Sequence, residues 1–573
     1  MQRTESDPPI SSAPDELAAA SALQRSGRFA EAQALLERLL EAEPDHFDAL
    51  FLAALIAAQS GHLRRAVLLF DRAIRIRPEH AAAHCNRGVA LAELGEFAAA
   101  LSSYDRAVSI KPDYATAHSN RGNAQKELGQ LQAALSSFDR AVAIKPDLAE
   151  AYVNRGTVLK DLGQFEAALQ SYDQAIGLRA DLPEAHSNRG MVLKELERWD
   201  AALASYDRAI ACKADFAEAH LNRGVLLAEL NRLESAVASY DRAIAINPGL
   251  AAAYVNRSMA CLLAGDLAAG WTDYEWRWKD EAGTNARERR DFRQPLWLGQ
   301  PSPAGKSILI YGEQGLGDTL QFCRYAKPLA ELGAEVILEV QKPLETLLKG
   351  LAGVSHLAAR GGVLPEFDYQ CPLLSLPLAF KTRLESIPAA ARYIHVDASR
   401  TAQWRDRLPA GSRPRVGLMW SGNAMHRRDR YRSLALADLI RYLPAEIHYV
   451  SLQKEVRESD AAALRSNAEV MDFADDQGDF SDAAALCECM DLVISVDTSV
   501  AHLSGALGKE TWILLPFSPD WRWLLGRVDS PWYPTVRLYR QERIDDWSGV
   551  LGRVAADLVR KFPAARARVE LAK

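Results

Sequence analysis

The sequence predicts a helical solenoid followed by an α/β region built on parallel sheets. Two observations predict this order. An Asn-Arg-Gly fragment, Asn-Arg-Ser in its last copy, recurs every 34 residues through the first half of the chain, and a fixed period of this length marks stacked helical repeats. The period ends near residue 284, and from Lys306 short apolar runs alternate with glycine-rich turns and helical patterns, as in βαβ units. At 573 residues the chain is also too long for one core.

The repeats carry small and aromatic residues in a fixed register, and proline closes several of them. In one unit these are Ala66, where two helices must approach closely, Phe70 on the same helix, and Pro78 at the end. A 34-residue period with this pattern is typical of tetratricopeptide repeats, whose paired helices bury their apolar stripes by stacking on neighbours. We expect seven repeats and a degenerate eighth over residues 13–284, after a disordered N-terminus at 1–12.

One asparagine recurs at the sixth position of the units, which faces the concave side in repeats of this kind. The set is Asn86, Asn120, Asn154, Asn188, Asn222 and Asn256. This arrangement resembles the repeat domain of O-GlcNAc transferases, where an asparagine ladder holds an extended peptide, and it implies a peptide or protein partner. An amide both donates and accepts, so it pairs with a peptide unit without reading its side chain. The alternative is a structural or solvated polar ladder.

The repeats depart from that family at the next position. Arg87 and its equivalents occupy a place where leucine is usual. We expect these arginines to pair with acidic groups such as Asp105.

The last repeat is rich in aromatic residues. Gly270 replaces the usual alanine, and Trp271, Tyr274, Trp276 and Trp278 follow in its second helix. We interpret this helix as the seam where the solenoid docks onto the next domain. An aromatic core that simply caps the solenoid is the alternative.

The second half predicts two α/β lobes. We expect a linker at 285–305, a first lobe at 306–397 and a second lobe, with the closing helix, at 398–573. A helical pattern covers Thr319 to Leu332. The expected strands are Ser307–Tyr311, Glu335–Val340, Arg415–Trp420, His448–Leu452, Leu492–Val496 and Thr511–Pro516, and the closing helix is Trp547–Lys561. Ligands of such sheets bind at the carboxyl ends of the strands.

A polar segment follows the first strand of each predicted lobe. Gly315, Gly317 and Asp318 form a turn that places a carboxylate at a helix start; capping of that helix is the alternative role of Asp318. In the second lobe, small polar residues precede several guanidinium groups, and a lysine ends the next strand. The set consists of Ser421, Asn423, Arg430, Arg432 and Lys454. These groups suit a diphosphate, and a solvated basic loop is the alternative.

A third segment runs from a strand into Asp497, Thr498 and Ser499 at a helix start, with His502 one turn inside. Free amides and the helix dipole make such a turn an anion site. The alternative for His502 is a structural role. The segment resembles the Asp-Thr-x-x-x-His-x-x-x-Ala-Leu motif of heptosyltransferase-like glycosyltransferases, and the Gly-Leu-Gly-Asp turn matches their first-lobe motif.

This resemblance covers residues 306–560 and implies the two-lobed GT-B fold. It also implies that Asp318 is the catalytic base and that Asp497, Thr498 and His502 bind the phosphates of a nucleotide sugar. One departure is the Arg-rich loop at 427–432, where those enzymes place a lysine. As a whole, the chain resembles bacterial proteins that join tetratricopeptide repeats to such a domain.

The leading hypothesis is a metal-independent, inverting glycosyltransferase that uses a nucleotide-diphosphate donor and no cofactor. Asp318, or failing that Glu313, would take the proton of an acceptor hydroxyl, such as a protein Ser or Thr presented by the solenoid. A peptide-binding scaffold with an inactive transferase-like domain is the alternative from another class. A dinucleotide-dependent oxidoreductase fits poorly, because residues 312–317 lack the G-x-G-x-x-G spacing.

Composition and charge limit the partners and the cellular location that we expect for this chain. A net charge of -7 provides no global basic field for nucleic acid, and no apolar run approaches the roughly 20 residues of a membrane span. The 7 cysteines are scattered, and the first residues lack the apolar run of a signal peptide. We therefore expect a cytoplasmic protein without a transmembrane segment.

Overall fold

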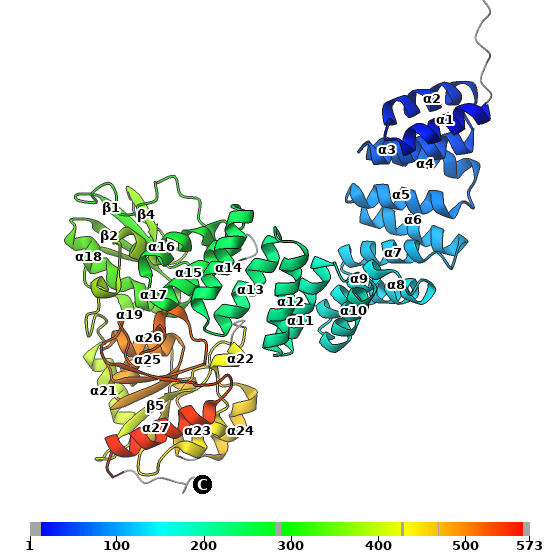
Figure 1. The fold of residues 1–573 in the computed structure, drawn as a ribbon. Coiled ribbons are helices and arrows are strands. Elements are labelled where there is room, and N and C mark those ends of the chain that lie inside the picture. The colour runs from blue at the N-terminus through cyan, green and yellow to red at the C-terminus, as the bar shows by residue number, and fades with distance from the viewer. Residues whose placement is uncertain (1–12, 281–282, 284–287, 426–428, 468, 565–573) are drawn as a thin grey trace, which may run out of the picture. The chain divides into compact units, whose positions relative to one another are not determined.

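The computed structural model describes residues 13–280, 283, 288–425, 429–467 and 469–564 (Figure 1). Its internal contacts divide the chain into two compact units, residues 1–222 and 223–573. Helix α13 (Ala217–Glu229) spans the division.

The first unit is a series of helix pairs joined by short turns. Its helices are α1 (Ala13–Arg25), α2 (Phe29–Ala42), α3 (Phe47–Gln59), α4 (Leu63–Ile76), α5 (Ala81–Glu93), α6 (Phe97–Ile110), α7 (Ala115–Glu127), α8 (Leu131–Ile144), α9 (Ala149–Asp161), α10 (Phe165–Leu178), α11 (Pro183–Glu195) and α12 (Trp199–Cys212). The predicted solenoid of tetratricopeptide repeats is confirmed.

The glycine of the recurring fragment is required by close packing between the two helices of a repeat. A Cβ added at Gly156 in α9 would lie 2.7 Å from a ring carbon of Tyr172 in α10. A Cβ added at Gly88 would likewise lie 2.6 Å from a ring carbon of Tyr104. Both rings are buried, so the absence of a side chain on one helix lets the aromatic ring of the other lie against its backbone.

The arginines of the fragment link successive repeats. Arg155 Nε donates to Asp139 in the preceding repeat at 2.7 Å, and its Nη1 donates to Ser171 in its own repeat at 2.6 Å. The predicted pairing with acidic groups is confirmed: Asp105 pairs with Arg121, while Arg87 pairs with Asp71. These pairs are partly exposed, so each contributes at most about 1 kcal/mol.

The second unit begins with the end of the repeat array. It contains α14 (Leu233–Ile246), α15 (Ala251–Ala264), α16 (Leu267–Tyr274) and the 3₁₀ turn η1 (Glu275–Trp278). Trp271 of α16 packs edge-on against Trp521 and Phe322, with ring centroids 5.1 and 6.3 Å away. The predicted seam is confirmed for Trp271, whereas Trp276 stacks on Tyr254 of the same repeat.

The first sheet has four parallel strands in the order β3-β2-β1-β4. The strands are β1 (Ser307–Tyr311), β2 (Glu335–Val340), β3 (His356–Ala359) and β4 (Tyr369–Pro372). Its helices and 3₁₀ turns are α17 (Leu316–Phe322), η3 (Cys323–Tyr325), α18 (Ala326–Glu331), η4 (Lys342–Leu344), α19 (Glu345–Leu348), η5 (Leu373–Ser375), α20 (Leu376–Ala379) and η6 (Leu384–Ser386). The helix expected at 319–332 is therefore broken by a 3₁₀ turn.

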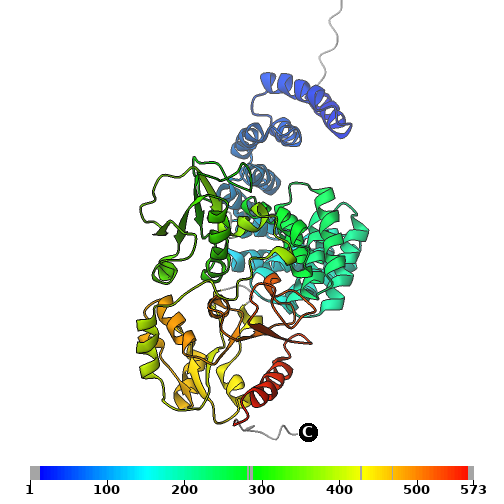
Figure 2. The same ribbon diagram turned by 90° about the vertical axis from the view of Figure 1, so that its left-hand side faces the viewer.

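The second sheet has six parallel strands in the order β10-β9-β8-β5-β6-β7. They are β5 (Arg415–Met419), β6 (His448–Ser451), β7 (Val470–Met471), β8 (Leu492–Val496), β9 (Thr511–Leu515) and β10 (Val536–Arg540). Around them lie α21 (Ala398–Arg407), α22 (Asp429–Arg432), α23 (Leu436–Tyr442), α24 (Glu458–Ser466), η7 (Ala474–Asp476), α25 (Phe480–Glu488), α26 (Ser499–Ala506), η8 (Trp521–Trp523) and α27 (Trp547–Lys561). The closing helix α27 packs on this sheet (Figure 2).

Both sheets reverse their strand order beside their first strand. In the first sheet β2 and β4 flank β1, and in the second β6 and β8 flank β5. The second order is that of a doubly wound dinucleotide-type sheet. Loops that leave neighbouring strands in opposite directions open a crevice at such a switch point.

The segment expected as a linker packs on the first sheet where it is described. Leu296 forms a parallel bridge with Gln370, and Trp297 is buried. Residues 284–287 lie outside the described part of the chain. In the ranges that the structure describes, no helix has both the length and the apolar character to cross a membrane.

We predict that Gly156→Ala destabilises the repeats by roughly 1–3 kcal/mol, because the added Cβ would overlap the buried ring of Tyr172. Gly177→Ala is the matched control: this residue is exposed in α10 of the same repeat, with nothing within 4 Å of an added Cβ. It should stabilise by up to about 1 kcal/mol through helix propensity. Urea unfolding followed by circular dichroism measures both, and equal effects would contradict the packing role.

Candidate functional site

A cleft of about 1650 Å³ lies at the carboxyl ends of strands from both sheets. Segments that follow β1, β5 and β8, the strands at the two switch points, contribute to its wall. Every residue predicted from the sequence for catalysis or nucleotide-sugar binding lines it except Ser421 and Arg430. Those that line it are Glu313, Gly315, Gly317, Asp318, Asn423, Arg432, Lys454, Asp497, Thr498, Ser499 and His502.

Asp318 lies in the first turn of α17 and has two partners. The Gly315 N–H donates to its Oδ2 at 2.9 Å, which caps the helix as the alternative interpretation expected. Its Oδ1 is ion-paired with Arg522. Burial raises the pKa of Asp318 above its usual value, and the Arg522 charge opposes that rise. The carboxylate is thus more basic than an ordinary aspartate and stays partly exposed to the cleft.

Glu313 belongs to the cleft wall, but its carboxylate is buried. None of its side chain is exposed, and Oε1 accepts hydrogen bonds from Arg277 Nη2 at 3.2 Å and from the Leu374 N–H at 3.3 Å. Burial raises its pKa to about 7. Because an acceptor hydroxyl cannot reach this buried oxygen, the prediction of Glu313 as a reserve base is corrected: the residue joins the last repeat to the first sheet.

The start of α26 faces the cleft at the carboxyl end of β8. Thr498 is the N-cap residue, and Ser499 is the first residue of the helix. No side chain caps these first amides, because the Thr498 hydroxyl bonds to Ser495 at 3.1 Å instead. Uncapped amides at a helix start suit an anionic ligand.

His502 has a packing role. Its ring is stacked on Trp523 at a centroid distance of 5.2 Å, and a 2.9 Å hydrogen bond joins its Nδ1 to Tyr533 Oη. Burial, with a contribution from the Arg522 charge, lowers the pKa of His502 to about 3, so the ring is neutral at pH 7. A Cβ at Gly317 would lie 2.8 Å from His502 Cδ2, and this contact accounts for the glycine.

Of the basic side chains predicted to bind the diphosphate, Arg432 and Lys454 line the cleft and Arg430 does not. Arg432 Nη1 donates to the Asp497 carbonyl at 2.9 Å, and Lys454 is exposed on the cleft wall and bonds to the Gly478 carbonyl. Arg430 stacks on Tyr431 instead, at 4.5 Å from the ring centroid. Residues 426–428 lie outside the described part of the loop.

The two small polar residues after β5 differ in their position relative to the cleft. Ser421 is fully buried and does not line the cleft, so its prediction as a ligand residue is corrected. Asn423 lines the cleft, but its Oδ1 accepts from the Met425 N–H at 2.9 Å and closes a turn.

The sequence reasoning missed a group that follows β9. Asp520, Trp521 and Arg522 line the cleft. Burial and the Asp520 charge raise the pKa of Asp497 to about 6, while Arg522 is among the cations that oppose the rise. These residues come shortly after a predicted strand, and that position was the signal that could have found them.

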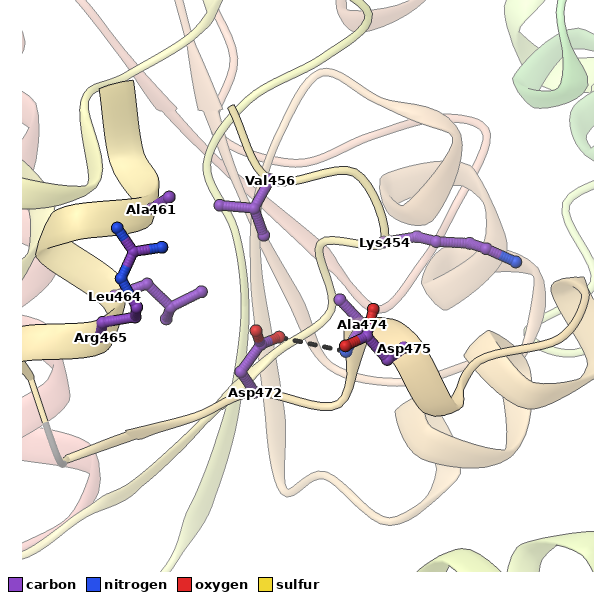
Figure 3. A pocket seen from close by; sticks show the side chains of 8 residues that line it. All are labelled: Lys454, Val456, Ala461, Leu464, Arg465, Asp472, Ala474 and Asp475. Atoms are coloured by element: carbon purple, nitrogen blue, oxygen red, sulfur yellow. Dashed lines mark hydrogen bonds between the residues drawn. The ribbon is translucent and has the colours of Figure 1, made fainter. Parts of the chain in front are cut away.

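A smaller pocket of about 350 Å³ adjoins the cleft and shares Lys454 and Val456 with it. Figure 3 shows Val456 and Leu464 pointing toward its centre, while Lys454 extends away. Asp472 accepts from the Ala474 N–H at 3.1 Å. Across the described residues, no cluster of histidine, cysteine and carboxylate side chains is arranged to hold a metal ion.

The asparagine ladder is uniform in position. Each member lies in the first helix of its repeat and is half-buried. Asn256 in α15 donates to the Ala252 carbonyl at 2.8 Å. Met259, one turn further along α15, lines the cleft.

Two protein families match the repeats of this chain. A family described as TPR repeat matches residues 90–129, 124–163 and 156–197. A second, described as Tetratricopeptide repeat, matches 17–78 and 187–251. The N-terminal part of the chain is an array of tetratricopeptide repeats.

Individual relatives are distant. Protein FlbA of Caulobacter vibrioides is 28% identical over 331 residues, which is 53% of this chain and 54% of FlbA, so the chain spans about half the length of this relative. The TPR protein YrrB, whose structure is described as having an unusual peptide-binding site, is 29% identical over 32% of this chain and 95% of its own, with a TM-score of 0.29. PilF of Pseudomonas aeruginosa is 20% identical over 35% and 92%, with a TM-score of 0.33.

We predict that Glu313→Gln changes the pH dependence of stability. The pKa of Glu313 is about 7 in the folded protein and near the ordinary 4.5 when unfolded. The native state therefore binds the extra proton, and wild-type stability falls as pH rises through this window. Glutamine removes this loss, so the free energy of unfolding of the variant relative to wild type should rise by roughly 1–3 kcal/mol from pH 4.5 to 7.5.

Urea unfolding across that pH range, with Glu331→Gln at an exposed position as control, measures the difference. Parallel stability curves for wild type and Glu313→Gln would contradict it.

Proposed function

We propose that the chain is a glycosyltransferase that moves a sugar from a nucleotide-diphosphate donor to an acceptor hydroxyl. The observation that carries this proposal is the cleft itself. A partly exposed carboxylate, an uncapped helix start and basic side chains, three segments far apart in the sequence, line one cavity at the switch points of two parallel sheets. That combination suits a ligand with both an anionic diphosphate and a reacting hydroxyl.

In the proposed reaction the diphosphate lies at the start of α26. Its charge would be held by the first backbone amides of α26, from Ser499 onward, and by the Thr498 hydroxyl. Arg432 and Lys454 would add positive charge. The acceptor oxygen attacks the anomeric carbon while Asp318 takes its proton, and the bond from that carbon to the diphosphate oxygen breaks. The nucleoside diphosphate leaves with the electron pair, stabilised by the helix dipole and the cations. Because the acceptor attacks in a single displacement, the configuration at the anomeric carbon is inverted.

The repeats support a peptide or protein as acceptor. Asn256 and Met259 lie one turn apart on α15, and Met259 lines the cleft. An extended segment held at Asn256 would therefore reach the cleft wall. A Ser or Thr hydroxyl of such a segment is the acceptor that this path favours.

One observation favours the scaffold as a second candidate. Asp318, the proposed base, is already engaged by Arg522 and by the Gly315 amide. A protein that only binds peptides would keep such an arrangement for stability. Nucleotide binding separates the two functions.

We predict that wild type binds one of UDP, GDP and ADP saturably in calorimetric titrations, and that Lys454→Met weakens this binding about 10-fold. The lysine ammonium is exposed on the cleft wall, and its loss removes one charged contact to a phosphate. Lys327→Met is the control, because Lys327 is exposed on α18 away from the cleft. If none of the three nucleotides binds folded protein, the scaffold function is favoured.

We predict that Asp318→Asn lowers the rate of donor turnover by about 10²–10⁴-fold while nucleotide binding persists. The amide keeps the shape of the side chain but cannot take a proton. Release of nucleoside diphosphate from the matching sugar donor, with a Ser/Thr peptide library as acceptor, measures the rate. Asp529→Asn, at an exposed pair with Arg527 outside the cleft, serves as control. Wild-type turnover in Asp318→Asn would exclude Asp318 as the base.

A further inference from the structure

We propose that Arg522 is shared between Asp318 and the donor diphosphate, so that donor binding releases the catalytic base. The inference rests on the proposed function and adds a residue that the sequence reasoning did not find. Arg522 would bind the diphosphate directly and would also position Asp318 before the donor arrives.

The contacts of Arg522 show how its side chain is held. It lies in η8, just after β9, with 9% of its side chain exposed. Nη2 pairs with Asp318, Nη1 donates to Asp520 Oδ1 at 2.8 Å, and Nε donates to Gln321 Oε1 at 2.8 Å. The guanidinium also lies 4.3 Å from the ring centre of Trp521. Of these partners, Asp520 and Trp521 come from its own loop, while Asp318 and Gln321 come from α17 of the first sheet.

The position of Arg522 relative to the start of α26 gives it a second use. Asp318, Thr498, Asp520 and Arg522 line the same cleft. The start of α17 touches α26 through Gly317 and His502, so Asp318 and the uncapped amides of α26 belong to neighbouring helix starts. A diphosphate at α26 therefore brings phosphate oxygens close to the guanidinium that Asp318 holds.

Phosphate oxygens are strong competitors for this cation. A guanidinium offers donors in a rigid fork that matches phosphate as well as carboxylate. Asp520 and Gln321 hold the other donors in place, so only the Nη2 contact to Asp318 has to change. The side chain keeps its place, and Nη2 exchanges the Asp318 carboxylate for a phosphate oxygen.

The exchange ties the strength of the base to the presence of the donor. In the empty cleft, the Arg522 charge opposes the rise in the pKa of Asp318 that burial causes. When the phosphates take Arg522, Asp318 loses this cation, gains the repulsion of the diphosphate charge, and binds a proton more tightly. Asp318 then becomes an effective base for the acceptor hydroxyl only after the donor has bound.

The test is calorimetric titration of pyrophosphate, and of UDP, GDP and ADP, into wild type, Asp318→Asn, Arg522→Lys and the double variant. Asparagine removes the competing charge, so Asp318→Asn should bind diphosphates at least 5-fold more tightly. Arg522→Lys, which loses the fork, should bind them at least 10-fold more weakly, and in the double variant the gain from Asp318→Asn should disappear. Uridine, guanosine and adenosine, which carry no phosphate, should bind all four proteins alike.

Each outcome decides between the two proposals. If wild type binds a nucleoside diphosphate but Asp318→Asn binds it with unchanged or lower affinity, the sharing of Arg522 is overturned while the proposed function stands. If wild type binds neither pyrophosphate nor any of the three nucleotides, both proposals fail. Should Arg522→Lys not fold, the affinity of Asp318→Asn alone decides, because that substitution keeps the shape of the side chain.

Discussion

The end of the repeat array is fixed by a charge buried at its junction with the sheets. None of the Arg277 side chain is exposed. Its guanidinium donates to Glu275 at 2.6 Å, to Glu313 at 3.2 Å and to Ser375 at 2.7 Å, and lies over the rings of Tyr274 and Trp278. A buried charge that loses one partner costs about 3–5 kcal/mol. The last repeat and the first sheet must therefore keep one relative position, and the cleft wall that Tyr274 and Glu313 share is kept with it.

A single hydrophobic core continues from that junction. Leu262 and Trp271 of the last repeat, Ile310 of the first sheet and Ile513 of the second belong to one cluster of buried side chains. Across this core, Gly317 meets His502, and Arg522 meets Asp318. The candidate site thus lies where three structural layers are in direct contact, so its side chains are held by packing as well as by hydrogen bonds.

Strong local patterns in the sequence predicted much of this fold. Buried and mostly apolar runs such as Leu492–Val496 marked central strands, because a parallel strand covered on both faces is built largely from apolar residues. The missed strands β3, β4, β7 and β10 are the edge strands of the two sheets. Of these, β3, β4 and β7 are short, and β10 carries Arg537 and Arg540. The helix expected at 319–332 is broken because Pro328 lacks the N–H that a continuous helix would need.

The site was predictable in position but only partly in role. Strand ends followed by small polar residues indicated the cleft, since topology alone brings those ends together. Partners were not predictable: Arg522 meets Asp318 across 204 positions of sequence. The same limit applies to Glu313 and His502, whose roles follow from burial. No local pattern distinguishes a carboxylate that faces a cleft from one that faces a buried arginine.

The seam also bears on how this solenoid ends. A free-standing repeat array closes with a helix whose outer face is polar, because its last apolar face would otherwise meet water. Here α16 offers Leu267, Trp271 and Tyr274 to the core that the sheets complete. The α/β region is therefore the C-terminal cap of the solenoid. During synthesis the earlier repeats can stack as they emerge, whereas the final repeat must wait for strands made much later before its surface is covered.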